Sequence, residues 1–263
     1  MRALWTAASG MKAQQLNVDT ISNNLANVNT TAYKKQRVEF KDLLYATLSR
    51  TNLDLGEGKP VNLEVGHGVM PMATLRSFQK GNLEQTYNSL DFAINGDGFF
   101  VVRDGNDNLF YTKDGSFKLS VIDDEARLVT SEGYFVQSDG GDVELGADIE
   151  DIMVSAEGFI TVKRKGEAEA EELGQLSVVT FANSAGLEAV GKNLYVQTVA
   201  SGEPVEAIEG EGGEVLQGFL ETSNVQIVEE MIKLITAQRA YEINSKSIQT
   251  ADQMLEQANN LKR

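Results

Sequence analysis

The chain has 263 residues, of which 41% are hydrophobic, and it carries a formal net charge of −16 and no cysteine. This length allows a sizeable core and more than one domain. The lack of cysteine excludes disulfides, zinc–thiolate sites and thiol nucleophiles, and the negative charge argues against a general nucleic-acid binder. Residues 1–41 nevertheless hold six Lys/Arg and only two Asp/Glu, whereas the middle of the chain is strongly acidic.

The first predicted element is a helix within residues 1–30. Apolar residues recur there at alternating steps of three and four, which places them on one helix face, as in the seam of a coiled coil. The segment cannot bury this face by itself, so we expect it to lie in a subunit interface. The seam runs through Leu4, Ala7, Met11, Gln14, Val18, Ile21, Leu25 and Val28, and the interface residues expected among them are Leu4, Met11, Val18, Ile21 and Leu25. The apolar run at the start is too short for a signal peptide or a membrane span, so we expect no cleaved leader and no membrane insertion.

Asparagine is dense at the end of this predicted helix. Asn27 and Asn29 are typical of a helix end, because asparagine is a weak helix former and a good terminator. Asn23 and Asn24, together with Asn244 near the other end of the chain, are candidates to hydrogen-bond across a packed interface and fix its register.

Residues 31–70 are predicted to form a connector and an extended arm. Apolar spacing favours a short helix over 38–48, and glycines punctuate a long irregular stretch over 49–68. His67, the only histidine of the chain, lies in that stretch between two glycines. No cysteine or second histidine is near it to share a metal ion, so we expect no metal site there.

Residues 71–217 are predicted to form a central, acidic, β-rich domain. Short strands are expected over 72–78, 99–102, 109–112, 127–130, 134–137, 159–163, 176–181 and 194–197. Asp104-Gly105 and Asp114-Gly115 have the composition of hairpin turns. Short strands separated by glycine turns predict an antiparallel sandwich or barrel-like body. The acidic stretches 139–151 and 165–174 are predicted to be loops on this body.

Residues 218–263 are predicted to contain the last helix. Ser223 and Gln226, three residues later, fit a capping box, and the helix is expected to extend to about Asn259. Large apolar residues recur there every seven positions, and smaller residues follow three positions after each, at Ala237, Asn244, Ala251 and Ala258. The interface residues expected on this helix are Ile232, Leu234, Tyr241, Ile248 and Leu255. The predicted fold class is multidomain α plus β: terminal helices from both chain ends form a coiled-coil-like domain, and the middle forms an antiparallel all-β body.

No pattern in the chain indicates an enzyme. The loop over 104–108 lacks the glycine and the glutamate that an EF-hand needs at fixed positions. The glycines over 210–213 lack the spacing of a dinucleotide fingerprint. Carboxylates are abundant, but no two of them stand out as a glycosidase pair. We therefore expect no catalytic residue, no cofactor and no metal ion.

Long motifs at both ends resemble a known family. Residues 9–11 (SGM) and 17–34 (NVDTISNNLANVNTTAYK) resemble the N-terminal signature of the bacterial flagellar rod and hook proteins. Residues 217–225 (QGFLETSNV), 229–232 (EEMI) and 238–246 (QRAYEINSK) resemble the C-terminal signature of the same family. Within it, residues 4–5, 42–45 (DLLY), 79–83 (QKGNL) and 91–100 (DFAINGDGFF) are most similar to the distal-rod members.

The resemblance implies a structural subunit of the distal rod of the flagellar basal body. Such a subunit is exported by the flagellar type III apparatus without a cleaved signal, and it polymerises into a tubular drive shaft around the export channel. The implied partners are further copies of the chain, proximal rod subunits, hook subunits and the P- and L-ring proteins. The implied location is the periplasm and the outer-membrane bushing. The residues 49–68 correspond to a segment that distinguishes distal-rod proteins from hook proteins.

Two alternatives to the distal-rod interpretation stay open at this stage. The first is a proximal rod or hook-type axial subunit. The second is an acidic β-domain enzyme or adhesin with helical oligomerisation ends, which predicts a closed oligomer with a ligand cleft instead of an open-ended tube.

Overall fold

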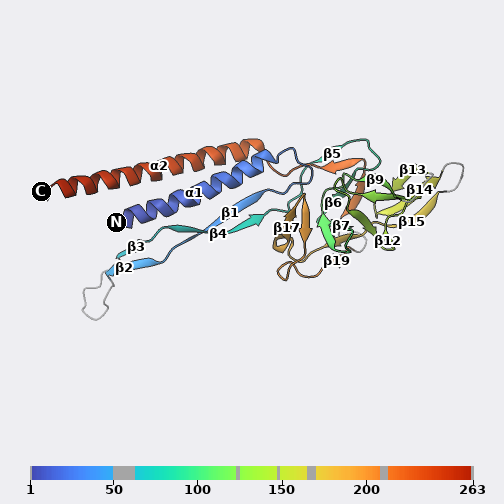
Figure 1. Cartoon of the computed structure of the whole chain (residues 1–263), viewed down its shortest axis with the longest axis horizontal. Coiled ribbons are helices and arrows are strands. Elements are labelled where there is room, and N and C mark those ends of the chain that lie inside the picture. Colours follow the sequence, from blue (N-terminus) through green and yellow to red (C-terminus); the bar gives the residue numbers. More distant parts are fainter. Residues whose placement is uncertain are drawn as a thin grey trace. The chain divides into compact units, whose positions relative to one another are not determined.

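The computed structural model describes residues 2–49, 63–122, 125–146, 149–164, 170–207 and 213–261 (Figure 1). The chain divides into two compact units. Unit 1 comprises Met1–Ala26, Gln36–Arg76 and Gln226–Arg263, and unit 2 comprises Asn27–Lys35 and Ser77–Val225. The backbone therefore passes from one unit to the other four times. The part of the predicted arm over 50–62 lies outside the described residues.

Unit 1 contains two long helices and two pairs of strands. Helix α1 (Arg2–Ala26) and helix α2 (Ile227–Asn260) lie side by side (Figure 1). Strand β1 (Gln36–Asp42) pairs antiparallel with β4 (Val69–Arg76), and β2 (Tyr45–Ser49) pairs antiparallel with β3 (Leu63–Gly66). α1 also packs on β1 and β4.

The short helix predicted over 38–48 is wrong, because β1 and β2 occupy this stretch. Along β1, half-buried Val38 and Phe40 alternate with exposed Arg37 and Glu39. This period of two is that of a strand with one covered face. The stretch is too short for its apolar spacing to distinguish the period of a helix from that of a strand.

The predicted capping box is also wrong. α2 begins at Ile227 after the N-cap residue Gln226, and no side chain of the described residues caps it by a hydrogen bond. Ser223 instead accepts a hydrogen bond at Oγ from the backbone N–H of Val225 (3.3 Å). The acidic residues Glu229 and Glu230 in the first turn favour the helix start through the helix dipole.

The predicted fold class is wrong as well. The main body of the described chain is β, with one helix at each end, and the two helices do not form a separate coiled-coil-like domain. They share unit 1 with β1–β4. The physical reason is visible on α1, where Ala13 is only 1% exposed although it lies outside the predicted seam. α1 thus buries a wider face than a two-helix seam requires, and the strands β1 and β4 cover part of it.

Unit 2 contains the remaining strands. They are β5 (Leu83–Gln85), β6 (Phe92–Asn95), β7 (Phe99–Arg103), β8 (Leu109–Thr112), β9 (Lys118–Ile122), β10 (Glu125–Val129), β11 (Phe135–Ser138), β12 (Gly141–Asp142), β13 (Ile149–Val154), β14 (Phe159–Arg164), β15 (Glu171–Gln175), β16 (Val178–Thr180), β17 (Glu188–Gly191), β18 (Leu194–Val196), β19 (Val205–Glu206), β20 (Glu214–Gln217) and β21 (Phe219–Glu221), with a 3-10 turn η2 (Ser184–Gly186). All the pairings among the described strands are antiparallel.

The largest sheet of unit 2 runs in the order β17-β18-β8-β7-β11-β10-β9, and smaller sheets are β13-β14-β15, β20-β6 and β21-β5. Strand β7 is covered on both faces. Phe99 packs with Tyr195 and Phe181, whereas its neighbour Phe100 packs with Phe117. Successive side chains of a strand point to opposite faces, so the two aromatic clusters lie on the two sides of this sheet.

The two acidic stretches predicted as loops are partly strand. The first, 139–151, contains β12 and the start of β13, and the second, 165–174, ends in β15. Residues 165–169 lie outside the described residues. Exposed acidic side chains are compatible with a strand that has one face in water, so charge density alone did not separate a loop from such a strand.

One of the two predicted hairpin turns is confirmed. Residues 104–108 join the antiparallel strands β7 and β8, and the Asp104 Oδ1 accepts a hydrogen bond from the Gly105 N–H (2.8 Å). The turn at Asp114-Gly115 joins β8 to β9, which do not pair. A Cβ placed on Gly115 would lie 1.8 Å from the Phe92 carbonyl oxygen, so this glycine serves a close approach to β6.

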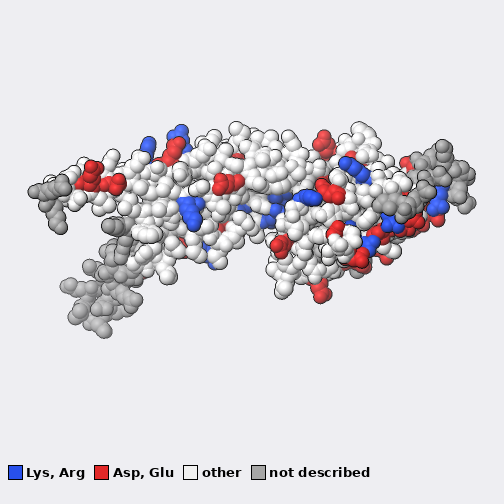
Figure 2. Space-filling model, viewed as in Figure 1, with Lys and Arg blue, Asp and Glu red and all other residues white. Residues whose placement is uncertain are grey.

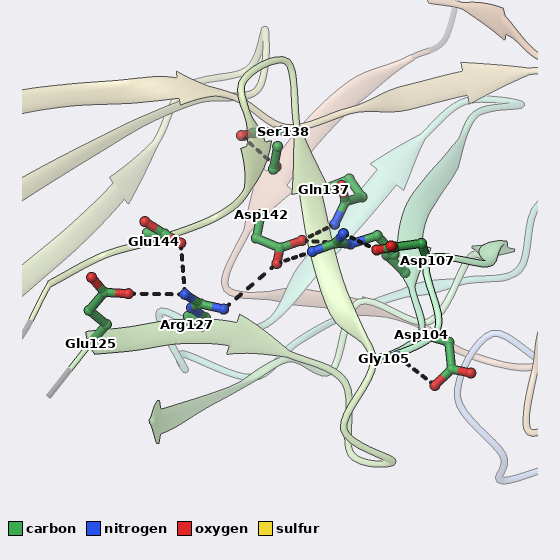
Figure 3. A network of polar contacts seen from close by, with 11 residues as sticks. Asp104, Gly105, Asp107, Glu125, Arg127, Gln137, Ser138, Asp142 and Glu144 are labelled. Atoms are coloured by element: carbon green, nitrogen blue, oxygen red, sulfur yellow. Dashed lines mark hydrogen bonds and ion pairs between the residues drawn. The ribbon is translucent and has the colours of Figure 1, made fainter. Parts of the chain in front are cut away.

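An ion-pair network ties β7, β10 and β12 together at the surface (Figure 3). Arg103 donates from Nη2 to Asp142 Oδ2 (2.6 Å) and also pairs with Asp107 in the hairpin turn. Arg127 pairs with Glu125 (3.0 Å) and Glu144 (2.9 Å) and lies 3.9 Å from the same Asp142 oxygen. Desolvation opposes the ionised form of Asp142, but hydrogen bonds and the charge of the two arginines outweigh it and lower the pKa of this carboxyl.

Candidate subunit interface

The contact between α1 and α2 is antiparallel and close. The Asn24 side chain near the end of α1 meets Glu230 near the start of α2. A Cβ placed on Gly10, toward the start of α1, would lie 2.9 Å from Nδ2 of Asn244. The register therefore sets residue 24 opposite 230 and residue 10 opposite 244. Small residues on both helices, Ala7, Ala237 and Ala251, are buried.

Asn24 connects three elements of unit 1. Its Nδ2 donates to Glu230 Oε2 on α2 (3.1 Å) and to the Gln36 carbonyl oxygen at the start of β1 (2.8 Å), and its Oδ1 accepts from the Gln36 N–H (2.9 Å). Lys233 donates to the other carboxylate oxygen of Glu230 (2.7 Å). Asn24 is only 1% exposed. A shifted register would leave these buried groups without partners, which is costly.

The three asparagines predicted to fix a register fall in different places. Asn24 is buried between α1, β1 and α2, and Asn244 is half-buried beside Gly10. Asn23 lies on the exposed face of α1. The structure therefore brings two of the three to the contact between the helices of one chain.

Most of the predicted seam residues are not fully buried within the single chain. Ile21 is buried. The other seam residues divide by exposure: Leu4, Met11, Val18, Leu25, Leu234 and Ile248 are half-buried, and Ile232, Tyr241 and Leu255 are exposed. The close contact between the helices is made by alanines and Gly10. Ala7, Ala237 and Ala251 were part of the predicted seams but not of the predicted interface residues. The signal for them was present, since Ala237, Asn244 and Ala251 recur every seven residues.

A groove of about 420 Å³ lies along one side of the helix pair. Its lining combines Val18 of α1 and Tyr241 of α2 with the polar residues Gln15, Gln238 and Glu242. Two of the predicted seam residues thus line an open groove between the two helices of one chain.

A second apolar surface lies on the first turns of α2. Val228, Ile232 and Ile235 are 70%, 61% and 55% exposed, and Ile227 and Met231 beside them are also exposed. Figure 2 shows acidic side chains gathered over the β14 and β15 part of unit 2, whereas basic and acidic side chains are scattered over unit 1. A contiguous exposed apolar stripe on a soluble protein marks an interaction surface.

A buried ion pair holds the entry segments of unit 2 together. Lys34 Nζ donates to Glu221 Oε1 (2.7 Å) and to the Gln79 carbonyl oxygen (3.0 Å), and both charged side chains are almost fully buried, at 0% and 2% exposure. Glu221 Oε1 also accepts from the Gly81 N–H (2.6 Å). Burial lowers the pKa of Lys34, and the attraction of Glu221 opposes that shift.

Asn224 adds a second tie between the same three segments. Its Oδ1 accepts from the Lys35 N–H (2.8 Å), and its Nδ2 donates to the carbonyl oxygens of Ser77 and Gln79 (both 2.9 Å). Segments 31–35, 77–82 and 221–224 thus form one junction inside unit 2. Three of the four passages of the chain between the units are at or near these segments.

Neither a membrane span nor a metal cluster is present in the described part of the chain. There, no helix is long and apolar enough to cross a membrane. Within those same residues, no three Asp, Glu or His side chains group as metal ligands.

Comparisons with known proteins define the class first. Residues 4–34 match the family described as "Flagella basal body rod protein", residues 93–162 match "Flagellar hook protein FlgE/F/G D1 domain", and residues 216–261 match "Flagellar basal body rod FlgEFG protein C-terminal". These matches cover both terminal helices and much of the β body, and they define a flagellar axial protein.

Relatives then narrow the family. The chain is 51% identical to the flagellar basal-body rod protein FlgG of Borreliella burgdorferi, over 100% of this chain and 99% of the relative. It is 43% identical to FlgG of Buchnera aphidicola subsp. Acyrthosiphon pisum (98% and 99%) and 37% identical to FlgG of Bacillus subtilis (100% of both). The chain belongs to the FlgG family of flagellar basal-body rod proteins. The resemblance noted in the sequence is thereby confirmed: the chain is a structural subunit of the flagellar rod, in the basal body.

One solved structure, the flagellar hook protein FlgE2 of Helicobacter pylori, is similar at 16% identity and a TM-score of 0.25, over 64% of this chain and 48% of that chain.

Proposed function

We propose that the chain polymerises through α1 and α2 into the tubular drive shaft of the distal rod, which transmits torque to the hook and surrounds the export channel. The observation that carries this proposal is the set of large apolar residues that α1 and α2 leave half-buried or exposed in the single chain. Complete burial of a fully exposed side chain of this kind gains roughly 1.5–3 kcal/mol, and a half-buried one gains correspondingly less when a neighbouring copy covers it. Many equal contacts in parallel supply the stiffness that a shaft needs.

The same proposal assigns roles along the chain. Residues 1–30 and 218–263 carry the assembly surface, 31–70 form a connector and arm, and 71–217 form the acidic β body. The interface residues are Leu4, Met11, Val18, Ile21, Leu25, Ile232, Leu234, Tyr241, Ile248 and Leu255, with Asn23, Asn24 and Asn244 as register residues. None of these roles needs chemistry, and the chain is not an enzyme.

The partners follow from a rod subunit's position. We assign proximal rod subunits and hook subunits to the two ends of the polymer and the P- and L-ring proteins to its circumference, in the periplasm and the outer-membrane bushing. Export by the flagellar type III apparatus brings the chain there. Further copies of the chain are the main partner.

The test is an Ile232→Asp variant of the full chain. Ile232 is 61% exposed, so the change disturbs little within the subunit, whereas Ile248 is half-buried. We expect the folded monomer to persist and the critical concentration for tube formation to rise by at least about tenfold, from the lost burial alone. Electron microscopy and sedimentation of the chain at increasing concentration measure the critical concentration for tube formation.

The matched control is Val121→Asp on the edge strand β9 of unit 2, where the side chain is 68% exposed. This variant should form tubes as the unaltered chain does. Normal tubes from Ile232→Asp, or equal loss from both variants, would contradict assembly through α2.

A further inference from the structure

We propose that the α2 stripe of one copy, formed by Val228, Ile232 and Ile235, docks in the α1–α2 groove of a second copy, which Val18 and Tyr241 line. This inference rests on the proposed self-assembly and adds which face of the subunit meets which. The occupant of the groove is thus a helix of another copy of this chain.

The spacing of the stripe is that of a helix that docks in a groove. Val228, Ile232 and Ile235 follow one another at i, i+4 and i+7, which sets three apolar anchors on one helix face. Their exposure increases toward the start of α2, from 55% at Ile235 to 70% at Val228. Each anchor is an aliphatic side chain of a size that fits between two helices.

The stripe cannot fill the groove of its own chain. Ala237, which is 3% exposed, marks the face of α2 that meets α1. Val228 precedes it by nine residues, which is about two and a half turns, so the two lie on opposite sides of the helix. The groove lies beside the α1–α2 contact, where Val18 and Tyr241 line it. Only a second copy can therefore bring this stripe to this groove.

The charges beside the two surfaces are complementary. Arg239 follows Ile235 by four residues and continues the stripe face, where it is exposed. Glu242 lines the groove and is exposed too. When the stripe of one copy meets the groove of another, Arg239 and Glu242 of different copies can therefore pair as opposite charges, which favours the contact between copies.

After one such contact has formed, each of the two copies still has an unoccupied surface for a further contact. A stripe and a groove are different surfaces, so a pair that has formed one contact still carries a free groove on one copy and a free stripe on the other. Such heterologous contacts produce rings or open helical polymers, whereas a stripe that met its own symmetry mate would close a dimer. A rod requires the open arrangement.

The test uses the absence of cysteine from the chain. Two full-length variants, Val18→Cys in the groove and Ile232→Cys on the stripe, are prepared separately, mixed, concentrated and oxidised mildly. A disulfide forms only where the two Cα atoms come within about 7 Å, and any disulfide between the variants joins two copies. We expect a covalent dimer in the mixture and loss of that band in either variant alone.

A Val121→Cys variant mixed with Val18→Cys serves as the control and should give no dimer. In tubes formed by Val18→Cys alone, the introduced thiol should lose its reaction with a soluble maleimide, because the stripe of the next copy covers it.

Three outcomes separate the inference from the proposed function. A mixture that forms tubes without the disulfide between positions 18 and 232, or with dimers of Ile232→Cys alone, overturns the inference and leaves self-assembly standing. Tubes of Val18→Cys whose thiol keeps full maleimide reactivity also overturn it, since another occupant or none then fills the groove. A chain that stays monomeric at every concentration, without any disulfide, removes the proposed function as well.

Discussion

Removing the charge of Glu221 should destabilise unit 2 strongly. In a Glu221→Leu variant the Lys34 ammonium keeps the Gln79 carbonyl oxygen, at 3.0 Å, and the more distant charge of Asp97, in a site with no exposure. Breaking a buried ion pair on one side costs about 3–5 kcal/mol. The destabilisation has an upper limit, because Lys34 can release its proton and become neutral. From its ordinary pKa of 10.5, deprotonation at neutral pH costs about 1.4 kcal/mol per pH unit, or about 5 kcal/mol in total.

Urea unfolding of the full chain measures this loss, with amide hydrogen exchange of unit 2 as the local readout. The single tryptophan, Trp5, lies in unit 1 and cannot report on it. With a urea dependence of about 2 kcal/mol per molar, a loss of about 4 kcal/mol lowers the midpoint by about 2 M. A Glu221→Gln variant, which keeps an acceptor for the Gly81 N–H, separates the charge from the hydrogen bond.

The decisive comparison is the double variant Lys34→Met, Glu221→Leu. Two apolar side chains leave no uncompensated charge, so the double variant should be more stable than either single variant. If each single change costs less than about 1 kcal/mol, or if the two costs simply add, the pair does not hold the junction through charge, and the reasoning from burial is refuted.

Three further changes test other close contacts. Gly81→Ala should destabilise unit 2 far more than Gly105→Ala in urea, because a Cβ at Gly81 would lie 2.0 Å from the Thr222 carbonyl oxygen and nothing lies within 4 Å at Gly105; equal midpoints would contradict this. Asn24→Ala should cost about 1–3 kcal/mol through the buried groups it leaves without a partner, seen as faster amide exchange in α1, and unchanged exchange would argue against its role. Burial lowers the pKa of Lys113 from 10.5 to about 8, so between these pH values the unfolded chain binds a proton that the folded chain has released, and stability should rise with pH by about 3 kcal/mol. A Lys113→Met variant should lack this rise in urea titrations from pH 7 to pH 10.5, and an identical pH profile would refute the assignment.

The sequence was sufficient for elements whose pattern is long and regular. The heptad repeats locate both terminal helices, because no common structure except a helix repeats an apolar face in this way over many turns. Strands such as β7 follow from short apolar runs of the Phe99–Val102 type. Apolar spacing gave the wrong element over 38–48, because so short a run fits a helix and two strands almost equally well.

The candidate site was only partly accessible from the sequence. An apolar seam has the same pattern whether its partner belongs to the same chain or to another copy, so the seam could not say which residues α1 and α2 share. The Lys34–Glu221 pair had no local signal at all, since 187 residues separate its members. Both nevertheless lie within the two terminal motifs, and the structure shows that these motifs meet at this pair.

The small and the large residues of α1 and α2 have different roles, and this difference links the fold to the proposed assembly. Alanines and Gly10 let α1 and α2 approach closely within one chain, and close approach needs little side-chain volume. Large residues such as Ile232 and Tyr241 then stay at the surface of the pair, where they gain nothing until another copy arrives. Within a single copy the helix pair is held by this close contact, by the Asn24–Glu230 hydrogen bond and by the packing of β1 and β4 on α1, and we propose that the exposed large residues are left for polymerisation. On the proposed assembly, such a subunit keeps a defined helix register while alone and gains further stability inside the rod.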